Sequence, residues 1–300
     1  MNTRVKLAGI TFQNPVTTAS GTFGSGMEYS EYVDLSRLGA VTTKGVSSIP
    51  WAGNPTPRLA ETYGGMLNAI GLQNPGVETF IRRDIPFLRQ YATKIIVNVV
   101  GKTIDEYCEV VERLADADVD LLEVNISCPN VKEGGIAFGQ DASRVEYITK
   151  ELKARAKQPI IVKLSPNVTD IAEMARAAEA GGADAISLIN TLTGMKIDIH
   201  KKTFLLANKT GGLSGPAIKP IAIRMVYQAA NAVKVPIIGM GGIMNAEDAL
   251  EFLMAGATMV AVGTANFINP RATLDVIEGI EAFMDNHGIK DINEIIGCVK

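Results

Sequence analysis

The feature that most constrains the fold of this 300-residue chain is a repeated alternation of short apolar runs and longer amphipathic stretches. The short runs are nearly continuous in apolar residues, as expected for parallel strands that are covered on both faces. The candidate strands are Val16–Ser20, Ala40–Lys44, Ile95–Val100, Leu121–Ile126, Ile160–Leu164, Ala185–Ile189, Ile237–Gly239 and Met259–Val262. The alternation predicts strand–helix units that share one parallel sheet.

Stretches with helical periodicity separate these runs, and several end in glycine, as at Ala180-Gly181-Gly182 and Ala255-Gly256. The predicted helices include Asp105–Ala115, Ser143–Ala156, Ile171–Ala180, Ile218–Ala232, Ala246–Ala255 and Arg271–Asn286. Eight strand–helix units predict an α/β fold of the (β/α)8 TIM-barrel type, and an open doubly wound sheet is the alternative. Because no linker divides the chain, we expect residues 1–300 to form a single domain.

Three further segments belong to this predicted barrel. The segment Lys6–Phe12 reads as an N-terminal β-hairpin that closes the bottom of the barrel. Ser47–Gly76 and Gly194–Gly215 read as long irregular loops. Both follow candidate strands, so both are expected on the C-terminal face, where barrel enzymes keep their active sites.

The charge composition argues against two classes of partner. The chain has 29 basic and 32 acidic residues, which gives no electrostatic reason to expect binding to nucleic acid or to anionic lipid. No apolar run approaches the roughly 20 residues that span a bilayer. The first residues carry no apolar signal-peptide region, so the sequence predicts a cytoplasmic protein without a membrane contact.

The few cysteine and histidine residues restrict metal chemistry. The chain has 3 cysteines, spread far apart, and 2 histidines, His200 and His287, in surface-like contexts. A disulfide framework, a histidine-rich metal site and an iron–sulfur cluster with four cysteine ligands are therefore not expected in this chain.

Glycine-rich segments follow the last two candidate strands. One is Gly239-Met240-Gly241-Gly242-Ile243 and the other is Val262-Gly263-Thr264-Ala265-Asn266. TIM barrels commonly bind phosphate with the loops after strands seven and eight, where backbone N–H groups approach the anion closely. Gly215 is a candidate third donor. Because no G-x-G-x-x-G segment follows a strand, a single phosphate, as in FMN, fits better than a dinucleotide.

Polar residues stand at or just past the ends of the candidate strands. They are Ser20, Lys44, Asn98, Asn125, Lys163 and Asn190. A lysine at the end of an apolar strand is expected to meet an anion or an electron-rich group, such as a reduced flavin ring. The amides of asparagine carry both a donor and an acceptor, which suits the imide groups of flavin and pyrimidine rings. A Schiff-base lysine at Lys163, as in aldolases, is the competing interpretation.

Cys128 is the one of the three cysteines that is expected at the barrel mouth, and a structural role is the alternative when the residue is taken alone. It follows the fourth candidate strand in the run Asn125-Ile126-Ser127-Cys128-Pro129-Asn130, and Pro129 disfavours helical geometry at Cys128. Cys108 lies within a predicted amphipathic helix and is expected to pack in the core. Cys298 lies near the end of the chain and is uninformative.

These segments resemble the dihydroorotate dehydrogenases along essentially the whole chain. The resemblance rests on Asn125–Asn130, Asn68–Gly76, Lys163–Asn167, Asn190-Thr191, Ser214-Gly215 and Gly241-Gly242. Class 2 members carry a membrane-associated N-terminal extension and a serine base, whereas this sequence begins without that extension and has Cys128 at the base position. Within class 1, the continuation Val131–Gly135 is more similar to the B-type catalytic subunit than to the homodimeric fumarate-using type.

The resemblance implies an oxidoreductase of de novo pyrimidine (UMP) biosynthesis that oxidises (S)-dihydroorotate to orotate. Cys128 would take the proton from C5 while hydride passes from C6 to FMN, one per chain. The residues implied for FMN binding are Ser20, Lys44, Gly45, Asn98, Asn125, Lys163, Ile189, Gly215, Gly241, Gly242, Gly263 and Thr264. The residues implied for substrate binding are Lys44, Asn68, Ala69, Ile70, Gly71, Leu72, Asn125, Asn190 and Thr191.

The resemblance also implies partners. B-type enzymes have a homodimer core within a heterotetramer, whose second subunit carries FAD and a [2Fe–2S] cluster and passes electrons to NAD⁺. This agrees with the count of three cysteines and with the absence of a G-x-G-x-x-G segment after a strand. Both indicate that this chain binds neither FAD nor an iron–sulfur cluster itself. Two alternatives stay open from the residues alone: another FMN barrel that reduces dihydropyrimidines, and the aldolase that uses Lys163. The sequence does not fix the terminal electron acceptor or the oligomeric state.

Overall fold

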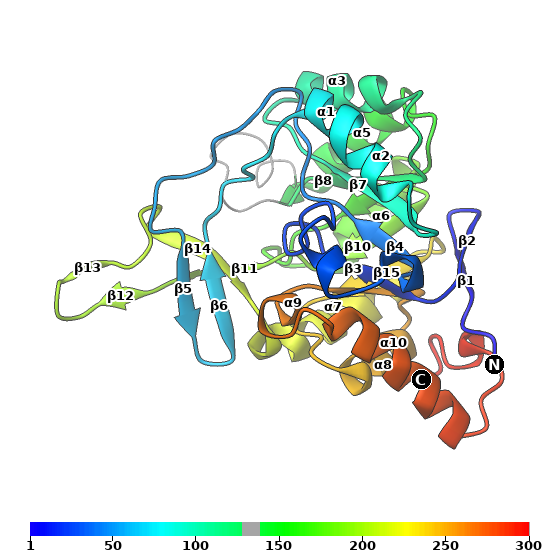
Figure 1. Cartoon of the computed structure of the whole chain (residues 1–300). Coiled ribbons are helices and arrows are strands. Elements are labelled where there is room, and N and C mark those ends of the chain that lie inside the picture. The colour runs from blue at the N-terminus through cyan, green and yellow to red at the C-terminus, as the bar shows by residue number, and fades with distance from the viewer. Residues whose placement is uncertain (128–138, 300) are drawn as a thin grey trace.

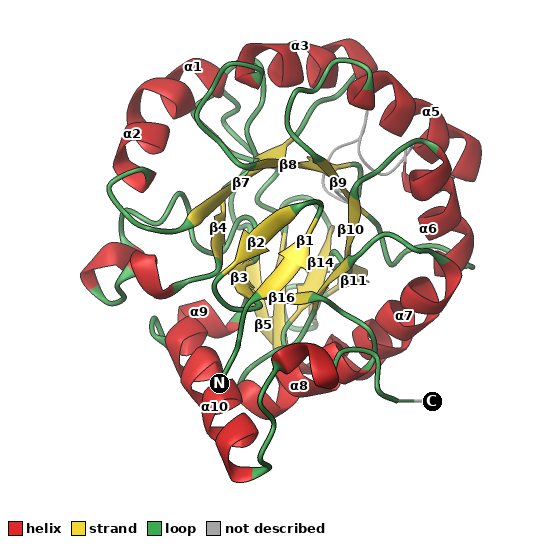
Figure 2. Cartoon of the chain, turned by 90° about the vertical axis from the view of Figure 1, so that its right-hand side faces the viewer, coloured by secondary structure: helices red, strands yellow, loops and turns green. Residues whose placement is uncertain are grey.

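The structure is a computed structural model that describes residues 1–127 and 139–299. Its central strands are β3 (Val16–Thr18), β4 (Ala40–Thr42), β7 (Lys94–Val99), β8 (Leu121–Asn125), β9 (Ile160–Lys163), β10 (Ala185–Leu188), β15 (Ile237–Met240) and β16 (Met259–Val262). They form a closed barrel in the order β10-β15-β16-β3-β4-β7-β8-β9 (Figure 2). All neighbouring pairs are parallel, so their carboxyl ends meet at one face.

Helices surround the barrel (Figure 2). They are α1 (Val77–Thr79), α2 (Ile85–Leu88), α3 (Ile104–Leu114), α5 (Ala142–Lys153), α6 (Ile171–Ala180), α7 (Lys219–Ala232), α8 (Ala246–Met254), α9 (Ala265–Ile268) and α10 (Ala272–Asn286). A π-helical turn, Phe80–Asp84, joins α1 to α2, and 3-10 turns span Tyr29–Glu31, Leu35–Arg37, Pro216–Ile218 and Ile292–Glu294. The longer helices are amphipathic, and their apolar faces pack on the barrel.

The barrel predicted from the alternating pattern is confirmed. Each predicted strand is present with bounds shifted by at most two residues, and each predicted helix is present within a few residues of its expected range. Because β16 pairs with β3 the sheet closes on itself, so the open-sheet alternative is wrong. The apolar runs predicted this outcome because both faces of each strand are covered, as their burial shows.

The predicted N-terminal hairpin is also present. β1 (Val5–Leu7) pairs antiparallel with β2 (Ile10–Phe12). Leu7 and Phe12 are fully buried, and the hairpin lies across the end of the barrel (Figure 2). The hairpin therefore covers the apolar interior at the end opposite the strands' carboxyl ends.

The two segments predicted as irregular loops contain short strands between their irregular stretches, which partly corrects that expectation. The first contains β5 (Leu59–Thr62) and β6 (Gly65–Asn68), and the second contains β11 (Leu192–Met195), β12 (Ile197–Asp198), β13 (Thr203–Phe204) and β14 (Thr210–Ser214). A four-stranded sheet in the order β11-β14-β6-β5 joins the two segments. Figure 1 shows this sheet beside the barrel, with the β12–β13 hairpin projecting beyond it.

Distant pairing explains why β14 was missed. Gly212 of β14 pairs with Asn68 of β6, 144 residues away. The run Thr210-Gly211-Gly212-Leu213-Ser214 has low strand propensity by itself because glycine weakens an isolated strand. The strand forms because both of its edges find partners in β11 and β6. As expected, both segments lie on the C-terminal face.

A capping box fixes the start of α8, just after the glycine pair Gly241-Gly242. The Asn245 side chain accepts a hydrogen bond from the N–H of Asp248 at 3.0 Å, and Asp248 Oδ2 accepts from the N–H of Asn245 at 3.3 Å and of Met244 at 2.8 Å. The other oxygen of Asp248 accepts from Lys219 Nζ of α7 at 2.6 Å. This network ties α7 and α8 together behind the glycine-rich loop.

We expect Asn245→Ala to lower the free energy of unfolding by about 1 kcal/mol, because the substitution removes the N-cap acceptor. Urea-induced unfolding followed by circular dichroism measures the change. Asn245→Asp is the matched control, since aspartate caps equally well and should stay near wild-type stability. Equal losses in the two variants would show that the cap contributes nothing.

Within residues 1–127 and 139–299, no helix has the length and apolar character that a membrane crossing requires. The same residues contain no cluster of three or more histidine, cysteine and acidic side chains that could hold a metal ion. His200 and His287 are both exposed, as expected from their sequence contexts.

Candidate active site

A large cavity opens at the carboxyl ends of the barrel strands. Its volume is about 850 Å³, which lies within the range of small-molecule and cofactor sites. The strand ends form its floor, and β5, β6, β14 and α9 contribute to its walls. The fold therefore places one roomy site where barrel enzymes carry out their chemistry.

Every residue predicted to bind the cofactor lines this cavity, and so do the predicted substrate residues except Ala69. The polar ring comes from six different barrel strands: Ser20 follows β3, Lys44 follows β4, Asn98 lies in β7, Asn125 and Lys163 end β8 and β9, and Asn190 follows β10. Asn98 differs from its expected position, because it lies within its strand, fully buried, rather than at the strand's end.

Glycines with unusual backbone geometry form one half of the cavity. Gly215 has φ +100°, Gly241 has φ +126° and Gly242 has φ +83°, values that side chains of L-residues rarely adopt. A Cβ atom at Gly242 would lie 2.9 Å from the carbonyl oxygen of Gly215, and one at Gly215 would lie 2.7 Å from Cα of Gly65. The loops thus approach so closely that only glycine fits.

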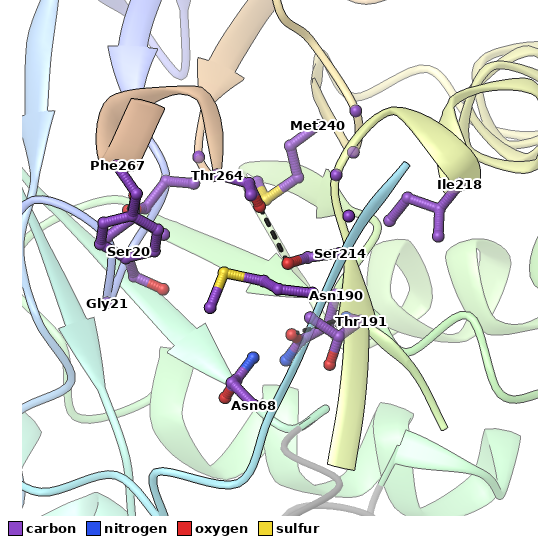
Figure 3. Close-up of a pocket in the computed structure, with 18 of the residues that line it drawn as sticks. Ser20, Gly21, Asn68, Asn190, Thr191, Ser214, Ile218, Met240, Thr264 and Phe267 are labelled. Atoms are coloured by element: carbon purple, nitrogen blue, oxygen red, sulfur yellow. Dashed lines mark hydrogen bonds between the residues drawn. The ribbon is translucent and has the colours of Figure 1, made fainter. Parts of the chain in front are cut away.

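Backbone N–H groups without a protein acceptor in this half of the cavity indicate a binding site for an anion. In the part of the chain that the structure describes, the N–H groups of Gly242, Gly263 and Thr264 donate to no protein acceptor. Thr264 Oγ1 donates to Ser214 Oγ at 2.8 Å, which ties the loop after β16 to the end of β14 (Figure 3). Backbone N–H groups gathered around a glycine-rich turn are a typical phosphate site. We call these loops, 214–215, 241–242 and 263–264, the anion cradle.

Two lysines bring positive charge to the cavity wall. Lys163 is 3% exposed, and its Nζ donates to Ser20 Oγ at 3.0 Å. Below it, Glu123 Oε1 lies 3.7 Å from the same nitrogen. Lys44 Nζ lies close to Gly21, which also lines the cavity. Both ammonium groups therefore stand where an electron-rich ring or an anion would meet them.

Amide and hydroxyl groups form the other half. Asn125 Oδ1 accepts from Ser127 Oγ at 2.9 Å, and Asn190 Nδ2 donates to the same Ser127 oxygen at 2.8 Å. Asn68, Asn190 and Thr191 lie together on this side of the cavity (Figure 3). The group offers both donors and acceptors to a small polar ring.

Among the predicted site residues that the structure describes, Ala69 alone does not line the cavity. Its side chain is fully buried with Leu67 and Leu206 in a small apolar cluster outside the barrel. The strand period of two explains this, since Asn68 and Ile70 face the cavity while Ala69 points to the opposite side. The neighbouring residues Ile70, Gly71 and Leu72 do line the cavity.

Cys128 lies outside the described residues, so its predicted place at the barrel mouth stays a prediction. The described residues on either side of segment 128–138 lie near the amide half of the cavity. Ser127 is fully buried beneath Asn190, and Gly139 packs so tightly against the carbonyl oxygen of Ile126 that a side chain there would clash with it. Gln140 Nε2 donates to the carbonyl oxygen of Asn167 at 3.1 Å.

The other two cysteines do not line the cavity. Cys108 is buried in the apolar face of α3, which confirms its packing role. Burial is the main cause that raises the pKa of the Cys108 thiol, so this thiol is poorly suited to act as a base. Cys298 is exposed near the end of the chain.

The sequence model of one protein family matches this chain from residue 2 to residue 284, and that family is described as dihydroorotate dehydrogenase. This match covers the barrel and every residue of the cavity. The chain belongs to the dihydroorotate dehydrogenase family. The resemblance seen in the sequence motifs is thereby confirmed.

Curated members of the dihydroorotate dehydrogenase family resemble the chain along its full length. A protein of Lachnoclostridium phytofermentans is 76% identical over 300 residues, covering 100% of both chains. A protein of Alkaliphilus metalliredigens is 70% identical over 299 residues, covering 100% of this chain and 99% of its own. Both are named dihydroorotate dehydrogenase B (NAD(+)), catalytic subunit, which agrees with the B-type resemblance in the sequence.

A solved structure of the same family shows the same fold. It is the dihydroorotate dehydrogenase of Eimeria tenella, determined in complex with ferulenol, with a TM-score of 0.83. The match covers 99% of this chain and 88% of that one at 22% identity. At that identity the likeness supports the barrel fold.

Some residues around the site were missed by the sequence analysis. Glu123 and Ser187 lie buried beneath the polar ring. Asn167 fixes the segment after β10, because its Nδ2 donates to the carbonyl oxygen of Thr191 at 3.1 Å and its Oδ1 accepts from the N–H of Thr193 at 2.9 Å. A lone carboxylate in the apolar run Leu121–Asn125 was the signal available for Glu123.

Proposed function

We propose that this chain is the FMN-binding catalytic subunit of an NAD-linked dihydroorotate dehydrogenase, acting as one domain over residues 1–300. It oxidises (S)-dihydroorotate to orotate in de novo pyrimidine biosynthesis. The observation that carries the proposal is the cavity itself. It joins an anion cradle and two lysines to a wall of amide and hydroxyl groups, in a chain with full-length relatives of that name.

The residues of the cavity fit FMN. The anion cradle offers unpaired backbone N–H groups for one phosphate, and the polar ring offers Lys163, Asn98 and Asn125 to the flavin ring. When bound, FMN supplies the acceptor for the hydride that leaves C6 of dihydroorotate.

The amide half fits dihydroorotate. Asn68, Asn125, Asn190 and Thr191 offer donors and acceptors that match the ring N–H and C=O groups, and Lys44 offers charge to a carboxylate. Cys128, next to the buried Ser127, is the base that removes the proton from C5 as the C5=C6 double bond forms. Its support is the sequence position and the anchoring of Ser127 to Asn125 and Asn190.

The name of the relatives also supports a proposal about the partners of this chain. The chain forms a homodimer core in a cytoplasmic heterotetramer, where a second subunit carries FAD and a [2Fe–2S] cluster and delivers electrons to NAD⁺. The term "catalytic subunit" in the names of the relatives supports the existence of a separate partner subunit. We expect dihydroorotate-dependent reduction of NAD⁺ only when that partner is present.

Anaerobic titration of the purified chain with dihydroorotate tests the function. We expect a yellow protein that releases FMN on denaturation and whose flavin absorbance is bleached by dihydroorotate but not by dihydrouracil. Bleaching by dihydrouracil instead would favour another dihydropyrimidine enzyme. A colourless protein that borohydride links to a carbonyl substrate at Lys163 would overturn the proposal in favour of an aldolase.

A thiol base predicts a pH dependence. A cysteine thiol ordinarily has a pKa of about 8.5, and only the deprotonated form accepts a proton. Flavin reduction should therefore speed up as the pH rises and level off above the thiol's pKa. Stopped-flow absorbance from about pH 6 to about pH 9 measures this. A flat profile with flavin reduction rate-limiting would contradict a thiol base.

A further inference from the structure

A buried carboxylate lies directly beneath the cavity floor and has no part in the proposed reaction. Glu123 is the middle residue of β8, is 1% exposed, and does not line the cavity. Its side chain shares the inner face of the strand with Asn125, two residues on. A fully buried carboxylate is costly unless it is paired and hydrogen-bonded, so its place inside the barrel needs a reason.

Both oxygens of Glu123 are engaged. Oε1 accepts from Asn98 Nδ2 at 2.6 Å, and Oε2 accepts from Ser187 Oγ at 2.8 Å. Oε1 also lies 3.7 Å from Lys163 Nζ, with both side chains almost fully buried. Side chains from three other barrel strands, β7, β9 and β10, therefore hold the carboxylate in one orientation under the ammonium group.

Lys163 thus stands between two environments. Its nitrogen has Glu123 on the barrel side and the cavity on the other, with Ser20 Oγ at 3.0 Å. The charged residues among those that line the cavity in the described chain are Lys44, Glu61 and Lys163, and Glu61 is exposed. The charge that a bound ring feels from Lys163 is consequently reduced by the carboxylate beneath it.

We propose that Glu123 is a positioning residue that acts through Lys163: it holds the ammonium at the cavity wall and limits how strongly it stabilises negative charge on the bound ring. The inference rests on the proposed binding of FMN, which gains electrons at this ring. Without the carboxylate, the ammonium should favour the reduced form of FMN over the oxidised form more strongly.

Glu123→Gln tests this because the amide keeps the size of the side chain and can still accept from Asn98 and meet Ser187. We expect the ratio of the dissociation constants of oxidised and reduced FMN to rise about tenfold, the scale of a unit charge removed a few ångströms away in a partly screened site. For a two-electron couple this is a rise of about 30 mV in the reduction potential. Equilibration with a reference dye measures the potential without substrate turnover.

Asp120→Asn is the matched control. Asp120 precedes β8 and forms an ion pair with Lys94 at 3.0 Å, at the opposite end of the barrel. This variant removes the same charge next to the same strand and should leave the FMN potential unchanged. An equal shift in both variants would show that overall charge, rather than the contact with Lys163, is responsible.

A double-mutant cycle tests whether Glu123 acts through Lys163. In a Lys163→Met background, Glu123→Gln should shift the potential far less than in the wild type, and additive shifts would overturn the proposal. If Glu123→Gln does not fold, Glu123→Asp withdraws the carboxylate from Lys163 and should shift the potential in the same direction. An unchanged potential in a folded Glu123 variant would also overturn it.

FMN binding and reduction by dihydroorotate, measured on the wild-type chain, distinguish a failure of the proposed function from a failure of this inference. If it binds no FMN, the proposed function fails. If it binds FMN and dihydroorotate reduces that FMN, but the Glu123 variants keep the wild-type potential, only the role of Glu123 fails.

Discussion

Cys128→Ala is expected to slow reduction of the bound flavin by dihydroorotate roughly 10²- to 10⁴-fold, the usual contribution of a positioned base. Alanine removes the proton acceptor but leaves the anion cradle and the polar ring intact, so the variant should still purify with FMN. Single-turnover stopped-flow absorbance under anaerobic conditions measures the rate without involving the partner subunit.

Cys108→Ala is the control for this prediction. Cys108 is buried in the apolar face of α3, so its loss should affect stability more than the rate of flavin reduction. Reduction at a near-wild-type rate in the Cys128 variant would remove Cys128 from the mechanism. Loss of FMN from that variant would instead show that the residue serves the cofactor site.

Gly242→Ala is expected to weaken FMN binding roughly 10- to 100-fold. Gly242 has φ +83°, and an added Cβ would lie 2.8 Å from Cβ of Lys219 and 2.9 Å from the carbonyl oxygen of Gly215. The anion cradle must shift, and a hydrogen bond to a charged group is worth about 1.5–3 kcal/mol. Quenching of FMN fluorescence on titration into the FMN-free protein measures the dissociation constant.

Gly288→Ala is the control that distinguishes an effect on the anion cradle from a general effect of backbone strain. Gly288 has φ +67°, and no atom lies within 4 Å of a Cβ built there. Both variants place alanine in a left-handed conformation, so both should lose stability, but only Gly242→Ala should lose affinity for FMN. Similar FMN dissociation constants in the two variants would contradict a phosphate site at Gly242.

The fold was predictable because parallel barrel strands are buried on both faces and therefore read as apolar runs. β16, for example, has the bounds expected from its sequence. The sheet formed by β5, β6, β11 and β14 was not predictable from local sequence. Its strands are short and half exposed, and the pairing of β6 with β14, which joins the two segments, spans 144 residues, so the sheet depends on tertiary contacts.

The candidate site was largely predictable because its residues sit at the ends of recognisable strands. Lys163 and Asn125 end β9 and β8 as expected. The residues that support the site were harder to predict from the sequence. Glu123, Ser187 and Asn98 meet only after the barrel closes and brings β8, β10 and β7 around one interior. Ala69 was wrongly predicted to bind substrate because it belongs to a family sequence motif. Residues of that motif alternate between two faces of the chain, and only one of these faces lines the cavity.

A crystal structure of the chain with FMN and orotate would show directly whether the Cys128 thiol and the flavin ring face opposite sides of the substrate ring. We expect orotate to lie between the two halves of the cavity, with Cys128 Sγ on one face near C5 and the flavin N5 on the other face near C6, each within about 3.5 Å. A Cys128 sulfur that points away from the bound orotate, or an FMN phosphate outside the anion cradle, would contradict the proposed reaction.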